Sequence, residues 1–216
     1  MNTIDAIDMD MKQVNALLRE CLNGHSVTIT NASHIHGLAA GFRHGEIHIQ
    51  SPAGDYLGVL NDGATIKVGQ SVGKYVADNM TRGEVIIKGD TDYGAAQYCY
   101  GGTVVIYGNA GDFTATMNKG ATIIVAGNVG GEAGTYMLGG DLIVTGNAGQ
   151  NFANYLIRGT VYIGGSWESL GHNTEGVALV DEDISKLRSL LEEYKIAADP
   201  AGFRKIVAAS TKPFYK

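Results

Sequence analysis

Short pairs of apolar residues recur along this chain at a constant interval. Each pair is two Val, Ile or Leu residues with one residue between them, and seven consecutive pairs follow at steps of 19 residues without insertion or deletion. The seven pairs are Ile47/Ile49, Ile66/Val68, Val85/Ile87, Val104/Ile106, Ile123/Val125, Leu142/Val144 and Val161/Ile163. Val27/Ile29 precedes them at a spacing of 20 residues. Alternation with a period of two predicts a β-strand in every copy, and the fixed interval predicts a repeat architecture.

Glycine and short polar residues keep the same period just after each strand. The corner glycines are Gly89, Gly108, Gly127, Gly146 and Gly165, and the polar residues that follow them are Asp90, Asn109, Asn128, Asn147 and Ser166. The segment "VTGNAGQN" at 144–151 is one copy of this corner. A dinucleotide-binding loop occurs once per βαβ unit and opens a helix, so it does not fit a segment that recurs in this way. We interpret the corner glycines as residues that adopt a positive φ at a tight bend, and the polar residues as a candidate side-chain ladder.

The 19-residue interval leaves no room for a helix between strands, so neighbouring coils are expected to stack with their strands in parallel. The predicted fold class is all-β, a right-handed single-stranded parallel β-helix with 19-residue coils and short helices at the N- and C-termini. Left-handed hexapeptide helices place an aliphatic residue at every sixth position. Here the aliphatic residues cluster in one strand per coil, which favours the right-handed form.

Amphipathic segments flank the repeat. Residues 10–22 and 183–195 place apolar residues at helical spacing, and Asp199 followed by Pro200 is typical of the start of another helix over 198–210. The predicted organisation is a capping helix segment at 1–23, a β-helix domain at 24–177 and a helical tail at 178–216. Each helix could cap an end of the coils, cover a strip of the sheet or dock on a partner.

Alternation within the strands also predicts which side chains point outward. Glu46 and Lys67 are charged, but the outward positions that follow them along the rod are apolar. This outward strip consists of Ile86, Val105, Ile124, Ile143 and Tyr162. A solvated sheet face does not need such residues, so the strip is a candidate partner surface. The alternative is that one of the chain's own terminal helices covers it.

Composition and charge exclude several classes of protein. The 31 glycines among 216 residues are about twice the usual share, and with only 3 prolines they fit a folded β structure rather than a linker. A net charge of -6 without a Lys/Arg block argues against a nucleic-acid partner. No apolar run is long enough to predict a membrane span, and the first residues do not resemble a secretory signal. We therefore expect a cytoplasmic protein.

Groups that could bind a metal or act as nucleophiles are few. The segment "HIHGLAAGFRHGEIH" contains His34, His36, His44 and His48, which form either a metal site or a set of exposed imidazoles near one end of the rod. Cys99 shares its column with mostly apolar residues, which favours a packed thiol over a nucleophile. The sequence assigns no metal ligand and no cofactor-binding residue.

Aromatic and acidic residues are candidate parts of a carbohydrate site. Tyr98, Tyr136 and Tyr155 share one column, for which stacked packing is a better interpretation than a sugar-binding strip. Asp55 and Asp112 also share a column, but they are not neighbours in it and no acid–base pair stands out. We assign no catalytic residue.

The repeated motifs resemble a known family. The segments "GGTVVIYGNAGD", "GATIIVAGNVGG" and "GGDLIVTGNAGQ" look like the GXGXG β-helix domain, which forms the C-terminal part of the large subunit of glutamate synthase. This domain also occurs as a free-standing protein, as in methylamine–glutamate N-methyltransferase (N-methylglutamate synthase), and the C subunit of formylmethanofuran dehydrogenase is similar. The resemblance covers residues 24 to about 175.

The resemblance implies a structural role. It predicts a non-catalytic scaffold subunit of a glutamate-synthase-like hetero-oligomer that forms glutamate or N-methylglutamate. The expected partners are a glutamine amidotransferase subunit and an FMN-dependent glutamate synthase-like subunit, and the resemblance implies that FMN and an iron–sulfur cluster are bound by partner subunits and not by this chain. Three alternatives stay open: a C subunit of the formylmethanofuran dehydrogenase type, a β-helix enzyme that acts on carbohydrate, and a β-helix that stacks end to end.

Overall fold

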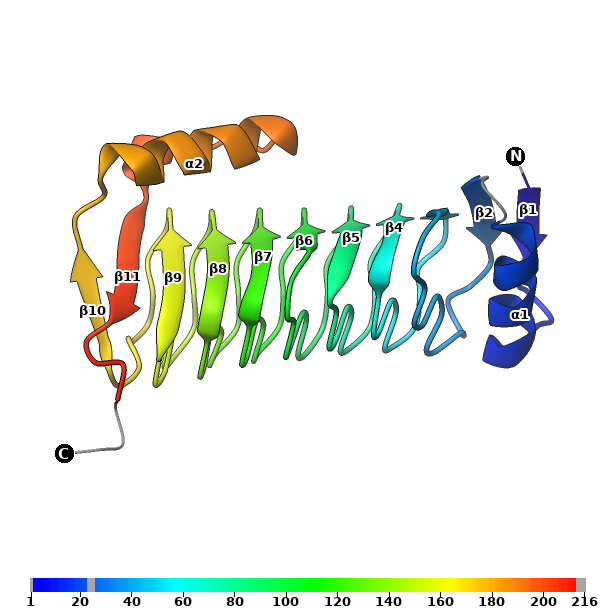
Figure 1. The fold of residues 1–216 in the computed structure, drawn as a ribbon, viewed down its shortest axis with the longest axis horizontal. Helices are drawn as coiled ribbons and strands as arrows, with labels where there is room; N and C mark the ends of the chain where they lie inside the picture. The colour runs from blue at the N-terminus through cyan, green and yellow to red at the C-terminus, as the bar shows by residue number, and fades with distance from the viewer. Residues whose placement is uncertain (1, 23–25, 213–216) are drawn as a thin grey trace.

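The computed structural model describes residues 2–22 and 26–212, and it shows a straight rod of stacked coils (Figure 1). The described chain forms one sheet of 11 strands, two α-helices and one short 3-10 helix, η1. In chain order these elements are β1 (Asn2–Asp5), α1 (Met11–Cys21), β2 (Ser26–Thr30), β3 (Glu46–Ile49), β4 (Asp62–Val68), β5 (Arg82–Ile87), β6 (Thr103–Ile106), β7 (Lys119–Val125), β8 (Leu138–Val144), β9 (Arg158–Ile163), β10 (Thr174–Val177), α2 (Asp181–Glu193), η1 (Pro200–Gly202) and β11 (Arg204–Ala208).

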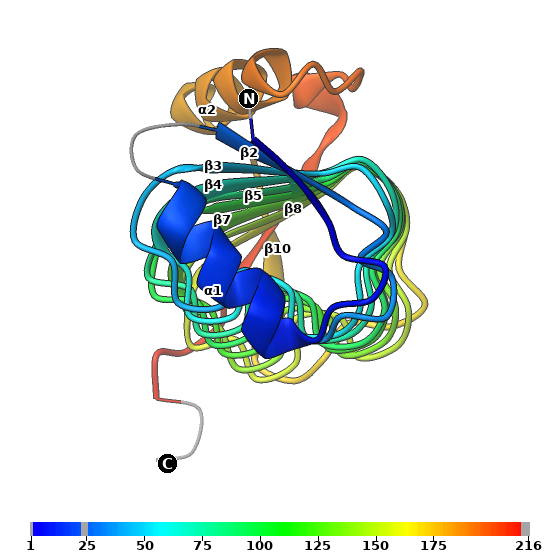
Figure 2. The same cartoon turned by 90° about the vertical axis from the view of Figure 1, so that its right-hand side faces the viewer.

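The predicted register of the coils is confirmed. Strands β1 to β9 pair in sequence order and in parallel, and Ile66, Val85, Val104 and Ile123 lie directly above one another. The earlier copy at Val27 joins the stack despite its 20-residue spacing. Seen from the amino-terminal end, the chain winds clockwise as it recedes, so the β-helix is right-handed (Figure 2).

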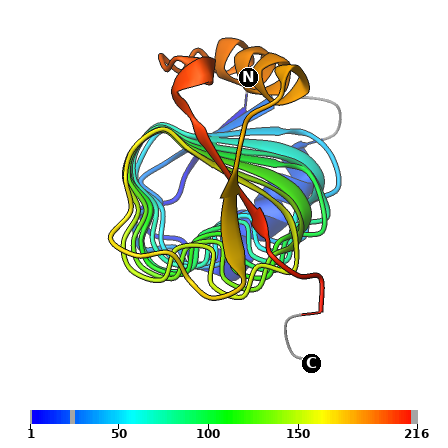
Figure 3. The same cartoon turned by 90° about the vertical axis from the view of Figure 1, so that its left-hand side faces the viewer.

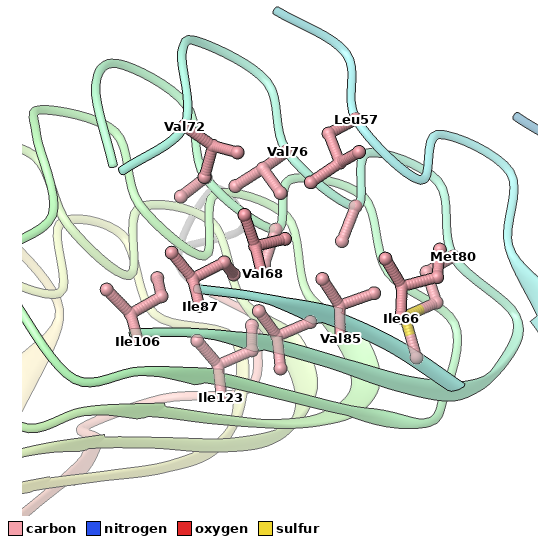
Figure 4. Packing of buried hydrophobic residues seen from close by; sticks show 14 of the residues in the cluster. Leu57, Ile66, Val68, Val72, Val76, Met80, Val85, Ile87, Ile106 and Ile123 are labelled. Carbon is pink, nitrogen blue, oxygen red and sulfur yellow. The ribbon is translucent and has the colours of Figure 1, made fainter. Parts of the chain in front are cut away.

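The core is a continuous column of apolar side chains inside the coils. One coil contributes Ile66 and Val68 from its strand, then Val72 from the corner and Val76 and Met80 from the turn (Figure 4). All five are at most 6% exposed. Burying one such side chain contributes about 1.5–3 kcal/mol, so the repeat itself accounts for much of the favourable free energy of folding.

The turn that follows each corner uses left-handed backbone at alternate residues. In one turn, Phe113, Ala115 and Met117 have φ of 60°, 62° and 53°. Such values are unfavourable for residues other than glycine. Their N–H groups are each bonded to a neighbouring coil, at 2.9, 2.8 and 2.8 Å, which offsets part of that cost. Because Ala115 points inward and is fully buried, this column holds only alanine or glycine in the six coils from Gly58 to Ala153.

The corner glycines have a different role from the one the sequence predicts. None of Gly89, Gly108, Gly127, Gly146 and Gly165 is among the positive-φ residues of the described chain, so the expectation of a left-handed bend there is wrong. A Cβ on Gly127 would lie 2.5 Å from the carbonyl oxygen of Gly108 in the preceding coil. The column therefore holds glycine because two backbones approach too closely for a side chain.

Helix α1 lies across the amino-terminal end of the rod (Figure 2). Asp10 and Gln13 form a reciprocal capping box at its start. Asn15 then bonds to the backbone of the first coil, donating to the Gly37 carbonyl at 2.9 Å and accepting from the Ala39 N–H at 2.8 Å. In later coils the equivalent N–H donates to a carbonyl oxygen of the preceding coil. In the first coil, the Asn15 side chain supplies the acceptor instead.

The carboxy-terminal segment departs from the predicted helical tail. The expected helix α2 is present, but the segment 198–210 forms only the short helix η1 followed by strand β11. β11 crosses the end of the rod and pairs antiparallel with both β9 and β10 (Figure 3). The sheet thus extends beyond the predicted boundaries 24–177, because β1 and β11 belong to it. Neither helix of the described chain is long and apolar enough to cross a bilayer.

Candidate functional site

Helix α2 lies along the outer face of the sheet and covers most of the predicted outward strip (Figure 1, Figure 2). Val105, Ile124 and Ile143 are fully buried and Tyr162 is 1% exposed. They form one cluster with Leu187, Leu191, Tyr194 and Phe203, and Ile86 packs at its edge. The prediction of a partner surface is therefore wrong for the four buried residues. The alternative, a helix of the chain itself, is the one that the structure shows.

Two polar clusters hold α2 on the sheet. At its amino-terminal end, the Asp183 carboxylate accepts hydrogen bonds from the Tyr162 hydroxyl at 2.6 Å and from Lys205 Nζ at 2.8 Å. It also accepts from the Val180 N–H at 3.0 Å. Desolvation by burial raises the pKa of Asp183, but the hydrogen bonds and the Lys205 charge outweigh it and lower the pKa from 3.8 to about 2. The carboxylate is therefore ionised and paired, and it fixes the start of the helix.

The second cluster fixes the carboxy-terminal end of α2. The Tyr107 hydroxyl donates to the Tyr194 carbonyl oxygen at 2.5 Å, and the Tyr194 hydroxyl donates to the Glu84 carboxylate at 2.8 Å. Between the two clusters, Lys186 pairs with Asp141 at 2.8 Å. Burial, and then the bond to Glu84, raise the pKa of the Tyr194 hydroxyl well above its usual value. These contacts make α2 part of the folded rod.

A groove lies on the sheet face where α2 ends. It has a volume of about 480 Å3, and the side chains that line it include His48, Lys67, Ile86, Lys88 and Tyr107. Lys67 pairs with Glu46 at 2.5 Å, whereas Lys88 Nζ lies over the Tyr107 ring at 3.5 Å from its centroid. The hydrogen bond from Lys67 lowers the pKa of the Glu46 carboxyl, and so does the Lys67 charge, although desolvation opposes both. The walls of the groove are thus partly cationic and partly apolar.

The predicted histidine cluster is not assembled into one site. His34 Nε2 lies 3.1 Å from the Met9 carbonyl oxygen, and His36 Nδ1 accepts from the Asp55 N–H at 3.0 Å. His48 Nε2 lies 3.1 Å from Glu46, while His44 lines a different hollow. Within residues 2–22 and 26–212, the structure brings together no group of three or more His, Cys, Asp or Glu side chains that could hold a metal. His34, His36 and His48 instead make separate local contacts.

Acidic and amide side chains near the corners join one coil to the next. The predicted ladder is confirmed, because Asn109 Oδ1 accepts from the Asn128 N–H at 2.9 Å and Asn128 Oδ1 accepts from the Asn147 N–H at 2.8 Å. Asp55 and Asp112 accept from the backbone of the following coil in the same way, each at 2.8 Å. These carboxylates are used structurally and do not form an acid–base pair.

Cys99 is a packed thiol, as predicted. It is fully buried in the core, and its Sγ donates to the Ala77 carbonyl oxygen at 3.2 Å. Burial raises the pKa of the thiol from 9.0 to about 12, so the nucleophilic thiolate is scarce at neutral pH. Cys99 therefore has neither the exposure nor the ionisation of a catalytic cysteine.

Aromatic residues follow both edges of the turns. The turns lie on the side of the rod away from α2 (Figure 2). Tyr56 stacks on Tyr75 with ring centroids 4.9 Å apart, and Tyr136 stacks on Tyr155 at 5.5 Å. Stacked packing is thus confirmed for Tyr136 and Tyr155. The sequence interpretation missed that some of these side chains stay exposed, since Tyr136 is 36% and nearby Tyr100 is 56% accessible.

Comparisons with known proteins support the fold and point to an assembly. No protein-family model matches the chain, and no curated protein matches its sequence. Among solved structures, it is similar to a chain in the crystal structure of the formyltransferase/hydrolase complex (FhcABCD) from Methylorubrum extorquens in complex with methylofuran. The TM-score is 0.68 and the identity is 25%, over 80% of this chain and 68% of that chain. This chain therefore shares its fold with a component of a multi-subunit assembly.

Proposed function

We propose that this chain is a non-catalytic scaffold subunit of a multi-subunit assembly that transfers or hydrolyses formyl groups. The observation that carries the proposal is the likeness to a chain of the formyltransferase/hydrolase complex over 80% of the residues. The local chemistry agrees with a scaffold, because the Asp and Asn side chains of the corners bond to the next coil and the buried thiol is not activated. A rigid rod with an apolar interior is suited to holding other subunits at fixed positions.

Isolation of the native assembly tests this proposal. The chain carries an affinity tag in the cells that naturally make it, and the tagged material is examined by native mass spectrometry and assayed for formyl transfer and hydrolysis with methylofuran. We expect different protein subunits in fixed proportion and activity that co-elutes with the chain. Recovery of the chain by itself, in a preparation where the tag is intact and the chain is folded, would refute a scaffold role.

The motif resemblance favours a second candidate, a glutamate-synthase-like complex. The repeated Gly-Asn-Ala-Gly corners at 108–111 and 146–149 are the specific features behind it. In that case partner subunits would bind FMN and an iron–sulfur cluster, and the isolated complex would show their visible absorbance. Glutamine-dependent formation of glutamate, measured beside formyl transfer on the same preparation, separates the two candidates.

A further inference from the structure

Exposed apolar side chains of the coils are concentrated on one side of the rod. Within residues 26–173, the structure leaves four large apolar side chains at least 36% exposed: Tyr56, Leu60, Tyr100 and Tyr136, at 43%, 57%, 56% and 36%. All four belong to the turns or to the residues that lead from a turn into the next strand. We call this side the turn face. It lies away from α2, which covers the other apolar surface (Figure 2).

The turn face has the composition of a protein interface. Half-buried Tyr98, Met117 and Leu138 lie among the exposed residues, and Tyr and Met are enriched at the centres of interfaces. The backbone beneath them is bonded from coil to coil, for example from the Met117 N–H to the Thr135 carbonyl at 2.8 Å. Rigid presentation lowers the conformational entropy lost on binding, so each side chain can contribute more to affinity.

The turn face carries both signs of charge: Asp78, Asp112 and Glu132 are in its turns, whereas Lys119 and Arg158 lie where turns lead into strands. Lys119 Nζ lies over the Tyr100 ring at 3.8 Å from its centroid, and Arg158 is exposed at the start of β9, two strands along the sheet from Lys119 on β7. Neither forms an ion pair with a carboxylate in the part of the chain that the structure describes. A second copy that met the edge around Lys119 and Arg158 with the same edge would bring like charges together.

We infer that the turn face docks on a different protein subunit whose surface presents carboxylates among apolar side chains. This inference rests on the proposed function, because it assigns the surface through which the scaffold holds a partner. Tyr100 is the expected anchor, since Tyr is enriched among the residues that dominate binding, and the exposed Leu60 adds apolar contact area. Lys119 is expected to pair with a partner carboxylate.

Site-specific photo-crosslinking in the native complex tests the inference. Benzoylphenylalanine replaces Leu60 or Tyr100, and as a matched control it replaces the exposed Ser189 on α2, at the opposite side of the rod. We expect Leu60 and Tyr100 to cross-link to one subunit that differs from this chain, and the control not to do so. Tyr100→Ala and Lys119→Glu should each weaken the affinity for that isolated subunit about tenfold to thirtyfold, while Arg188→Glu on α2 leaves it within twofold.

The outcomes distinguish a wrong choice of docking surface from a failure of the proposed scaffold function. If the intact complex is recovered but cross-links arise only at Ser189, or unchanged affinity follows Tyr100→Ala and Lys119→Glu, the turn face is the wrong surface and the scaffold role stands. A cross-linked pair of this chain with itself overturns the choice of partner. If no other subunit is recovered, the proposed function fails first. Thermal unfolding of the variants within about 2 °C of the parent shows that folding is intact.

Discussion

The corner glycines offer a sharp test of how the coils are held together. In Gly127→Ala the new methyl group would lie 2.5 Å from the Gly108 carbonyl oxygen, whereas ordinary contact begins at 3.4 Å. The two backbones must therefore separate by about 0.9 Å, the difference between these distances. Gly69→Ala is the matched control, because the methyl group there would lie 3.5 Å from its nearest atom, the Gln50 carbonyl oxygen.

The expected effects have opposite signs. Overpacking at Gly127 costs about 1–3 kcal/mol, and weakening the adjacent bond from the Asn128 N–H to Asn109 adds about 0.5–1.5 kcal/mol. In both variants, alanine restricts the unfolded chain more than glycine does, which raises the free energy of unfolding by about 0.4–1 kcal/mol. We therefore expect Gly127→Ala to lower the free energy of unfolding by about 1–4 kcal/mol, and Gly69→Ala to change it by no more than about 1 kcal/mol in the stabilising direction.

Thermal and urea unfolding followed by circular dichroism measure both variants under identical conditions. For a chain of this length, 1 kcal/mol shifts Tm by about 2–4 °C. A third variant, Gly127→Asn, separates close approach from a left-handed backbone, because Asn tolerates positive φ but carries a larger side chain than Ala. Close approach predicts that Asn is at least as harmful as Ala. An Asn variant more stable than the Ala variant would refute the reasoning.

Other predictions concern the helices and the thiols. The pKa of Asp183 is lowered from 3.8 to about 2, so the ionised carboxylate contributes about 2 kcal/mol to the free energy of unfolding above pH 3.8, and this contribution is lost as the pH falls towards 2. Hydrogen exchange should therefore show α2 loosening over this pH range. In Asp183→Asn, α2 should be loose at every pH, so no such change is expected. Asn15→Ala should lower the free energy of unfolding by about 1–3 kcal/mol and speed hydrogen exchange at Ala39, with protection in the central coils unchanged. In the folded protein a thiol reagent should modify half-buried Cys21 and spare Cys99; equal rates would contradict the packing of Cys99.

The coil stack could be predicted from the sequence because its contacts follow directly from a constant interval. When every coil has the same length, Ile66 must lie above Val85, and the pattern of alternation then fixes which side chains point inward. The same regularity identified the Asn109–Asn128 ladder. The role of Gly127 was misread because sequence shows that a side chain is absent but not whether φ or a neighbouring backbone excludes it.

The carboxy-terminal segment could not be predicted because its structure depends on a distant partner. Asp199 and Pro200 are a good helix start, and they do begin the short helix η1. The residues that follow include Ile206 and Val207, which have β-branched side chains; they form β11 instead, which pairs with the free edge of β9 through Arg204–Ile206. That edge exists only once the coils are stacked. The Asp199–Pro200 pattern therefore predicted the start of a helix correctly, and the pairing of β11 with β9 determined the structure of the residues after it.

The two apolar faces of the rod explain why the functional surface was hard to locate. The outward strip and helix α2 are each apolar on one side, and sequence cannot say whether such surfaces meet within a chain or between chains. The structure joins them through eight buried residues and two polar clusters. That leaves the turn face as the apolar surface of the coils without a covering helix among the described elements. The polar groups of the corners bond one coil to the next and are not free to bind a partner. Side chains that can contact a partner lie on the turn face, where Tyr100 and Lys119 are in contact with each other.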